Sequence, residues 1–156
     1  MAIRTADPAT DLIRLLARRH LLVGWAGLVV FLSLGITLEL LHGLKLNFYL
    51  DPGNTARRLM WTLAHAHGTL FSLIQIAFAL SLPSLHASPT KALRLVSRCL
   101  IGALVLMPAG FFLGGLRLYG GDPGLGVFLV PVGALMLLVG VSVFFGMLYR
   151  NHRRPM

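Results

Sequence analysis

Long apolar runs separated by short polar segments dominate the chain. Four of these runs cover residues 21–41, 59–82, 95–118 and 125–149. A helix that crosses a bilayer needs about 20 mostly apolar residues, and each run reaches that length. Backbone groups in lipid must pair within their own segment, so runs of this length predict helices rather than the short alternating segments of a porin-like barrel. The pattern therefore predicts an all-α membrane protein, a single domain 1–156 that forms a four-transmembrane-helix bundle.

A short amphipathic segment, 11–19, precedes the first run. Leu12, Leu15 and Leu16 would share one face of a helix, while the arginines of the segment lie elsewhere. This arrangement is typical of a helix that lies in the membrane interface. His20 follows where the segment enters the membrane, and we interpret it as a histidine at headgroup level.

Composition agrees with the membrane class. The 156 residues are 56% hydrophobic and 12% charged, and the mean hydropathy is +0.79. Soluble domains carry about 25% charged residues, roughly twice as many. The single cysteine, Cys99, excludes the thiol–disulfide relay enzymes, because these enzymes need cysteine pairs.

The formal net charge of +9 follows the predicted topology. Ten of the 14 lysines and arginines lie before the first run, from the end of the second run to Arg98 at the start of the third, or after the fourth. The other four lie in the first outer loop or, as Arg117, at the end of the third run. The positive-inside rule then predicts that both termini are cytoplasmic (N-in/C-in), in a membrane such as the bacterial inner membrane. We attribute the charge to topology and expect no nucleic-acid partner.

Ionisable residues inside the predicted spans are the main functional candidates, because such side chains are costly at membrane depth. Glu39, the only glutamate, and His42 are three residues apart and share one helix face. His65 and His67 are two residues apart, or about 200° around a regular helix, and point to nearly opposite sides. The alternative for Glu39 and His42 is that both reach the outer headgroups and face water.

The predicted topology brings these polar groups to one depth. The first helix runs outward and the second inward, so all four residues fall in the outer third of the bundle. The predicted metal ligands are Glu39, His42, His65 and His67. Predicted neighbours that would contact the ligands or a substrate are Arg57, Arg58, Trp61, Gln75, Arg117 and Asp122. For Gln75 the alternative is a hydrogen bond between helices.

Three chemistries would use this set. Copper, iron or zinc accepts imidazole nitrogen and carboxylate oxygen, and Glu39 with His42 and one histidine of the second run would supply three protein ligands. Haem iron needs only one or two axial imidazoles. A quinone site or a proton relay would need one histidine and one carboxylate within hydrogen-bond reach.

The A-H-A-H-G segment at 64–68, preceded by an aromatic residue, resembles the catalytic subunits of haem–copper oxidases. In that family a His-x-His pair on one transmembrane helix holds two haems on its opposite faces. The resemblance covers about ten residues and carries that role only onto His65 and His67. The family's larger helical core and its further histidines have no counterpart in this chain.

These observations predict a small integral membrane protein that binds a redox metal or haem and serves respiratory electron transport or metal handling. One alternative is a non-catalytic subunit or assembly factor, whose histidines make buried hydrogen bonds between helices. Another is a proton or ion transporter that uses Glu39 and His65. The expected partners are the lipid bilayer and either further copies in a homo-oligomer or a larger membrane complex. No catalytic residue is predicted.

Overall fold

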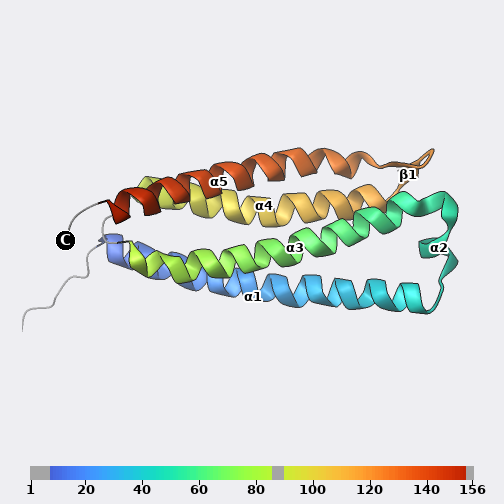
Figure 1. Ribbon diagram of the computed structural model, residues 1–156, viewed down its shortest axis with the longest axis horizontal. Coiled ribbons are helices and arrows are strands. Elements are labelled where there is room, and N and C mark those ends of the chain that lie inside the picture. The colour runs from blue at the N-terminus through green and yellow to red at the C-terminus, as the bar shows by residue number, and fades with distance from the viewer. Residues whose placement is uncertain (1–7, 86–89, 154–156) are drawn as a thin grey trace, which may run out of the picture.

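Four long helices make up most of the computed structural model, which describes residues 8–85 and 90–153 (Figure 1). The long helices are α1 (Pro8–Gly43), α3 (Thr55–Ser81), α4 (Thr90–Leu116) and α5 (Leu129–His152). The short elements are α2 (Asn47–Leu50), η1 (Pro52–Asn54), η2 (Leu82–Ser84), β1 (Leu118–Tyr119), β2 (Asp122–Pro123) and η3 (Leu125–Phe128). The prediction of an all-α chain with four apolar helices is confirmed.

Each long helix has the length and composition to cross a membrane. The four predicted runs lie within these helices apart from a few residues at their ends. The amphipathic segment 11–19 is not a separate interfacial helix, because α1 continues through it without a break for 36 residues. At 1.5 Å per residue α1 is about 54 Å long, longer than the roughly 30 Å hydrocarbon core of a bilayer.

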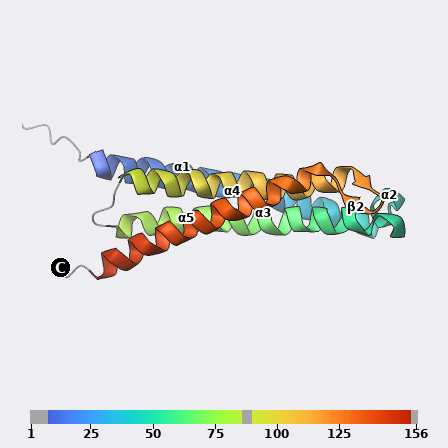
Figure 2. The ribbon, with the colours of Figure 1, turned by 90° about the horizontal axis from the view of Figure 1, so that it is seen from above.

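The two ends of the bundle differ in what they carry. The N-terminal end of α1 and the C-terminal end of α5 lie together at one end, which we call the terminal end (Figures 1 and 2). The other, the hairpin end, carries α2 and the antiparallel pair of β1 and β2. Gly120 and Gly121, with φ of +60° and +95°, make the turn between these two strands.

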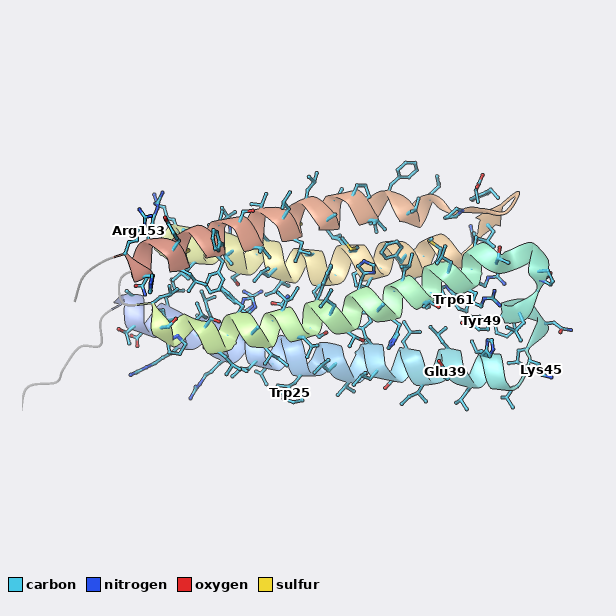
Figure 3. The ribbon with its side chains drawn as sticks, viewed as in Figure 1. Trp25, Glu39, Lys45, Tyr49, Trp61 and Arg153 are labelled. Atoms are coloured by element: carbon cyan, nitrogen blue, oxygen red, sulfur yellow. The ribbon has the colours of Figure 1, made fainter. Side chains whose placement is uncertain are left out.

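Helices α3 and α4 form the centre of the bundle. Helix α1 packs mainly on α3, and α5 packs mainly on α4. Large apolar side chains of α1 and α5 are therefore left exposed, including Trp25, which points away from the other helices (Figure 3). Exposed apolar surface of this extent suits contact with lipid.

Two groups of buried apolar side chains hold the long helices together. The group at the terminal end consists of Leu16, Phe78, Leu82, Leu85, Leu93, Val96 and Leu100. Its Leu16 belongs to the segment predicted to lie in the interface, so that face of α1 packs against protein instead. The group nearer the middle consists of Phe71, Ala103, Leu104 and Met107.

Glycines let α1 approach α3 closely. A Cβ atom added to Gly27 would lie 2.2 Å from Ser72 Oγ, and one added to Gly35 would lie 2.4 Å from Cε1 of His65. Neither position has room for a side chain, as expected where small residues bring helix backbones together. The same contact fixes which part of α1 faces His65.

Candidate functional site

A groove at the hairpin end runs between α1 and α3, with α2 beside it. Its volume is about 940 Å³. The polar side chains that line the groove are Glu39, His42, Tyr49, Thr55, Arg58, Thr62 and His65. Figure 3 shows Glu39 on α1, with Tyr49 of α2 near the same end.

The part of the groove nearest the hairpin end, which we call its mouth, carries most of the charged groups, and apolar side chains of α1 line the part further from that end. His42 and Arg58, both exposed, lie near the ends of their helices, whereas His65 lies ten residues into α3, about 15 Å from its start. Leu32 and Ile36 of α1 also line the groove, and they are 48% and 64% exposed. A ligand in this groove would meet both an apolar wall and charged groups, the usual character of a cofactor pocket.

Glu39 and His42 share one face of α1, as predicted, since both line the groove. Both side chains are also exposed. Their exposure agrees with the alternative in which they face water, and their position also places them beside any ligand that enters the groove. The two roles are compatible at this position.

His65 is held in a defined orientation by α1. Its Nδ1 lies 2.7 Å from the carbonyl oxygen of Phe31, and its ring lies against Gly35. A carbonyl oxygen only accepts hydrogen bonds, so Nδ1 carries the hydrogen and donates it. In the neutral ring Nε2 then keeps a lone pair, and it makes no hydrogen bond within the described residues. Histidines that ligate metals are commonly held this way through their other nitrogen.

His67 faces the opposite neighbour. Its Nδ1 donates to the carbonyl oxygen of Leu63 at 2.9 Å, one turn earlier in α3. Its ring lies 4.9 Å from that of Phe111 on α4 and 5.8 Å from that of Phe71. The prediction that His65 and His67 diverge is confirmed, and His67 does not line the groove.

The structure therefore does not bring the four predicted ligands together. Glu39, His42 and His65 line the groove, while His67 lies on the α4 side of α3. No group of three or more histidine, cysteine, aspartate or glutamate side chains in the described parts of the chain could hold a metal ion. The roughly 200° between His65 and His67 explains why one ion cannot use both.

Arg57 and Trp61 tie the hairpin end together and do not line the groove. Arg57 donates from Nη1 to the carbonyl oxygen of Phe48 in α2 at 2.8 Å, and from Nε to that of Gly115 in α4 at 3.1 Å. Trp61 Nε1 donates to the carbonyl oxygen of Phe112 at 3.1 Å. The bonds to Gly115 and Phe112 supply donors to backbone oxygens near the C-terminal end of α4.

Of the remaining predicted neighbours, only Arg58 lines the groove. Arg117 and Asp122 are exposed near the β1–β2 turn, outside the groove. Gln75 is fully buried toward the terminal end, and the alternative of a hydrogen bond between helices is confirmed. Its Nε2 donates to the carbonyl oxygen of Leu100 in α4 at 2.8 Å.

A buried polar cluster around Gln75 went unpredicted. His20 is 0% exposed and hydrogen-bonds through Nδ1 to Gln75 Oε1 and through Nε2 to Ser97 Oγ, at 2.8 Å for the latter. His20 lies more than three turns into α1, which begins at Pro8, and its side chain faces other helices rather than lipid headgroups; its level in the membrane stays a prediction.

Comparison with protein-family models, curated proteins and solved structures finds no match to this chain. The resemblance to haem–copper oxidases, which covers about ten residues around 64–68, stays a prediction.

Proposed function

We propose that this chain is a small integral membrane protein that binds one haem in the groove at the hairpin end, with His65 as the axial ligand. The observation that carries the proposal is the fixed imidazole of His65, whose Nδ1 donates to Phe31 and whose Nε2 is left with a lone pair beside a groove of about 940 Å³. Haem would supply a redox-active iron, so the role that follows is electron transfer.

The donor set favours haem over a metal ion bound by side chains alone. Zinc and copper sites usually take three or four protein ligands, and the described residues offer no such group. Haem brings four nitrogen ligands of its own and needs only one or two from the protein. One well-oriented imidazole is therefore a sufficient protein contribution.

The groove suits the rest of the haem as well. Leu32 and Ile36 provide an apolar wall, and Arg58 lies at the mouth. Haem has an apolar ring and two carboxylate arms at one edge. Arginine pairs well with carboxylates through charge-assisted hydrogen bonds, so the arms would lie towards Arg58 and the ring deeper, towards His65.

Titration of the purified, detergent-solubilised protein with haem tests this proposal. We expect binding of one haem per chain, seen as a sharpened and shifted Soret band. His65→Ala should abolish this spectrum, and added free imidazole should restore it by occupying the space left by the side chain. His67→Ala is the matched control, because it removes a histidine of the same tautomer two residues away.

Two kinds of result would contradict haem binding through His65. Wild-type protein that shows no saturable shift of the Soret band does not bind haem. Equal loss in His65→Ala and His67→Ala, or loss in His65→Ala that imidazole does not restore, would assign these histidines a structural role instead.

We further propose that the helices cross the bacterial inner membrane with the terminal end in the cytoplasm. Exposed cations of three helices gather at that end: Arg14, Arg18, Arg19, Lys91, Arg94, Arg98, Arg150 and Arg153. This supports N-in/C-in by the positive-inside rule. Single cysteines introduced near Arg153 and near Asp122 in a Cys99→Ala background test it, because only the latter should react with an impermeant maleimide from outside the cell.

A second candidate, a subunit of a larger membrane complex, is favoured by the exposed flanks of the bundle. In the most apolar stretch of α5 only 11% of residues are buried, and in that of α1 only 17%. These flanks would bind either lipid or another membrane protein, including a second copy. Native mass spectrometry from mild detergent distinguishes these outcomes, since a chain that is monomeric under those conditions favours lipid.

A further inference from the structure

The cluster of His20, Gln75 and Ser97 joins three helices through a continuous set of hydrogen bonds. His20 of α1 bonds to Gln75 of α3 and to Ser97 of α4, and Gln75 bonds on to the carbonyl oxygen of Leu100 in α4. The three side chains are 0%, 0% and 2% exposed. This cluster lies toward the terminal end, whereas the groove lies at the hairpin end.

The hydrogen-bond partners of His20 determine which tautomer its neutral ring adopts. Gln75 Nε2 donates to a carbonyl oxygen, so its Oε1 is the atom that faces His20 and can only accept. His20 Nδ1 therefore carries the hydrogen. Its Nε2 then accepts from the Ser97 hydroxyl, and a neutral imidazole satisfies every contact in the cluster.

The surroundings of the cluster are tightly packed and apolar. The ring of Phe78 meets that of His20 edge-on, with centroids 4.6 Å apart. A Cβ atom added to Gly24 would lie 3.2 Å from Gln75 Cβ, so the α1 backbone covers this part of α3 directly. A polar group that lost its partner here would be buried unsatisfied, at a cost of roughly 1–3 kcal/mol.

Whether Gln75 keeps its hydrogen-bond partners depends on the rotation of α3 about its own axis. Advancing α3 by one residue turns it by about 100°, which would carry Gln75 away from both His20 and Leu100. The same rotation would move His65 off the α1 face. Ser72, which lies between them in sequence and contacts Gly27, is seven residues from His65 and so points within about 20° of the same direction.

We propose that His20, Gln75 and Ser97 form a neutral hydrogen-bonded lock that sets the rotation of α3 and thereby turns His65, and not His67, towards the groove. The three are positioning residues that act on His65 through Gln75, which lies ten helix positions away, about 15 Å along α3. This inference does not require haem, because it concerns the direction of His65 in the unliganded protein.

Nitrogen-15 NMR of the histidines in nanodiscs, without haem, tests the lock. In wild-type protein, His20 and His65 should each show a protonated Nδ1 and an unprotonated Nε2. In Gln75→Leu, a change similar in size that removes both amide bonds, the His20 Nδ1–H signal should shift. The His65 Nδ1–H signal should shift as well, and its hydrogen should exchange faster with water as the bond to Phe31 weakens.

Two serine variants complete the experiment. Ser97→Ala removes one bond of the lock and should produce a smaller shift at His65, and it decides the question alone if Gln75→Leu does not fold. Ser81→Ala is the matched control, because the hydroxyl of this partly exposed serine donates to the carbonyl oxygen of Ala77 in its own helix and takes no part in the cluster. It should leave His65 unchanged.

Two results would overturn the inference. A His65 signal that stays unchanged in every folded lock variant would show that the cluster acts only locally. A His20 ring with its hydrogen on Nε2 and none on Nδ1 would contradict the hydrogen-bond pattern itself, and a ring with hydrogens on both nitrogens would contradict the neutral lock. Both NMR measurements use haem-free protein, so a failure of haem binding would contradict the proposed function without contradicting the lock.

Discussion

His65 and His67 are separated by one residue on α3 but belong to different helix interfaces. His65 donates through Nδ1 to the Phe31 carbonyl of α1, whereas the ring of His67 lies 4.9 Å from Phe111 of α4. Each Nδ1 carries the hydrogen, and only His65 lines the groove. The pair therefore allows a direct comparison of the same side chain, with its hydrogen on the same ring nitrogen, inside and outside the candidate site.

Gly35 provides the space that the His65 ring occupies, so Gly35→Ala should displace it. The added methyl group would lie 2.4 Å from Cε1 of His65. Overpacking of this kind costs about 1–3 kcal/mol, which outweighs the roughly 1 kcal/mol that alanine gains over glycine in helix propensity. We expect a lower free energy of unfolding in an SDS titration.

Gly146→Ala serves as the control for that prediction. Gly146 lies within α5, and a Cβ atom there would meet nothing within 4 Å. Its free energy of unfolding should stay level or rise by up to roughly 1 kcal/mol. Equal destabilisation by both substitutions would mean that the contact between Gly35 and His65 does not limit the packing of α1 on α3.

Much of this fold could be predicted from the sequence because the length of an apolar run directly reports a helix that can cross a membrane. The divergence of His65 and His67 was equally predictable, since it follows from helix geometry alone. The acceptor of the His65 bond was not predictable. Which carbonyl of α1 lies beside His65 depends on how the two helices are rotated and shifted, and no local pattern encodes that.

The burial of His20 is a second case in which the sequence does not reveal a contact between helices. The arginines at 14, 18 and 19 suggest an interface segment, and they are indeed exposed. The opposite face of these turns packs into the bundle, where Leu16 is buried and His20 meets Gln75. Only the partners on α3 and α4, more than 50 residues away, make that burial favourable.

Gly27 and Ser72 form a second close contact between α1 and α3, and their substitutions should be coupled. A Cβ atom on Gly27 would lie 2.2 Å from Ser72 Oγ and 3.2 Å from Ser72 Cβ. Gly27→Ala should therefore destabilise the bundle, and Ser72→Ala in the same chain should recover part of the loss by removing the nearer atom. A double-mutant cycle should give a coupling energy of roughly 0.5–3 kcal/mol. Strictly additive effects would contradict direct contact.

The guanidinium group of Arg57 should be required for the stability of the hairpin end, and lysine should not replace it. Its Nη1 and Nε donate to carbonyl oxygens of two different elements, in Phe48 and Gly115. The compact ammonium of lysine cannot reproduce this fork, so Arg57→Lys should lose much of the stabilisation that Arg57→Ala loses. Hydrogen exchange of the backbone from 46 to 54 should be faster in both variants. Exchange in Arg57→Lys as slow as in wild type would show that the charge alone is sufficient.

Substitution of Arg58 tests whether the mouth of the groove binds the haem carboxylates, because Arg58 lines the groove and its neighbour Arg57 does not. If Arg58 pairs with the carboxylates of haem, Arg58→Gln should weaken haem binding about tenfold, which corresponds to roughly 1.4 kcal/mol for a charge-assisted hydrogen bond. Arg117→Gln is the matched control, since Arg117 is also exposed at the hairpin end but lies outside the groove. Raising the salt concentration should reduce the difference between wild type and Arg58→Gln, because an exposed ion pair is screened. The same affinity in both variants would remove Arg58 from the site and leave His65 as its only supported residue.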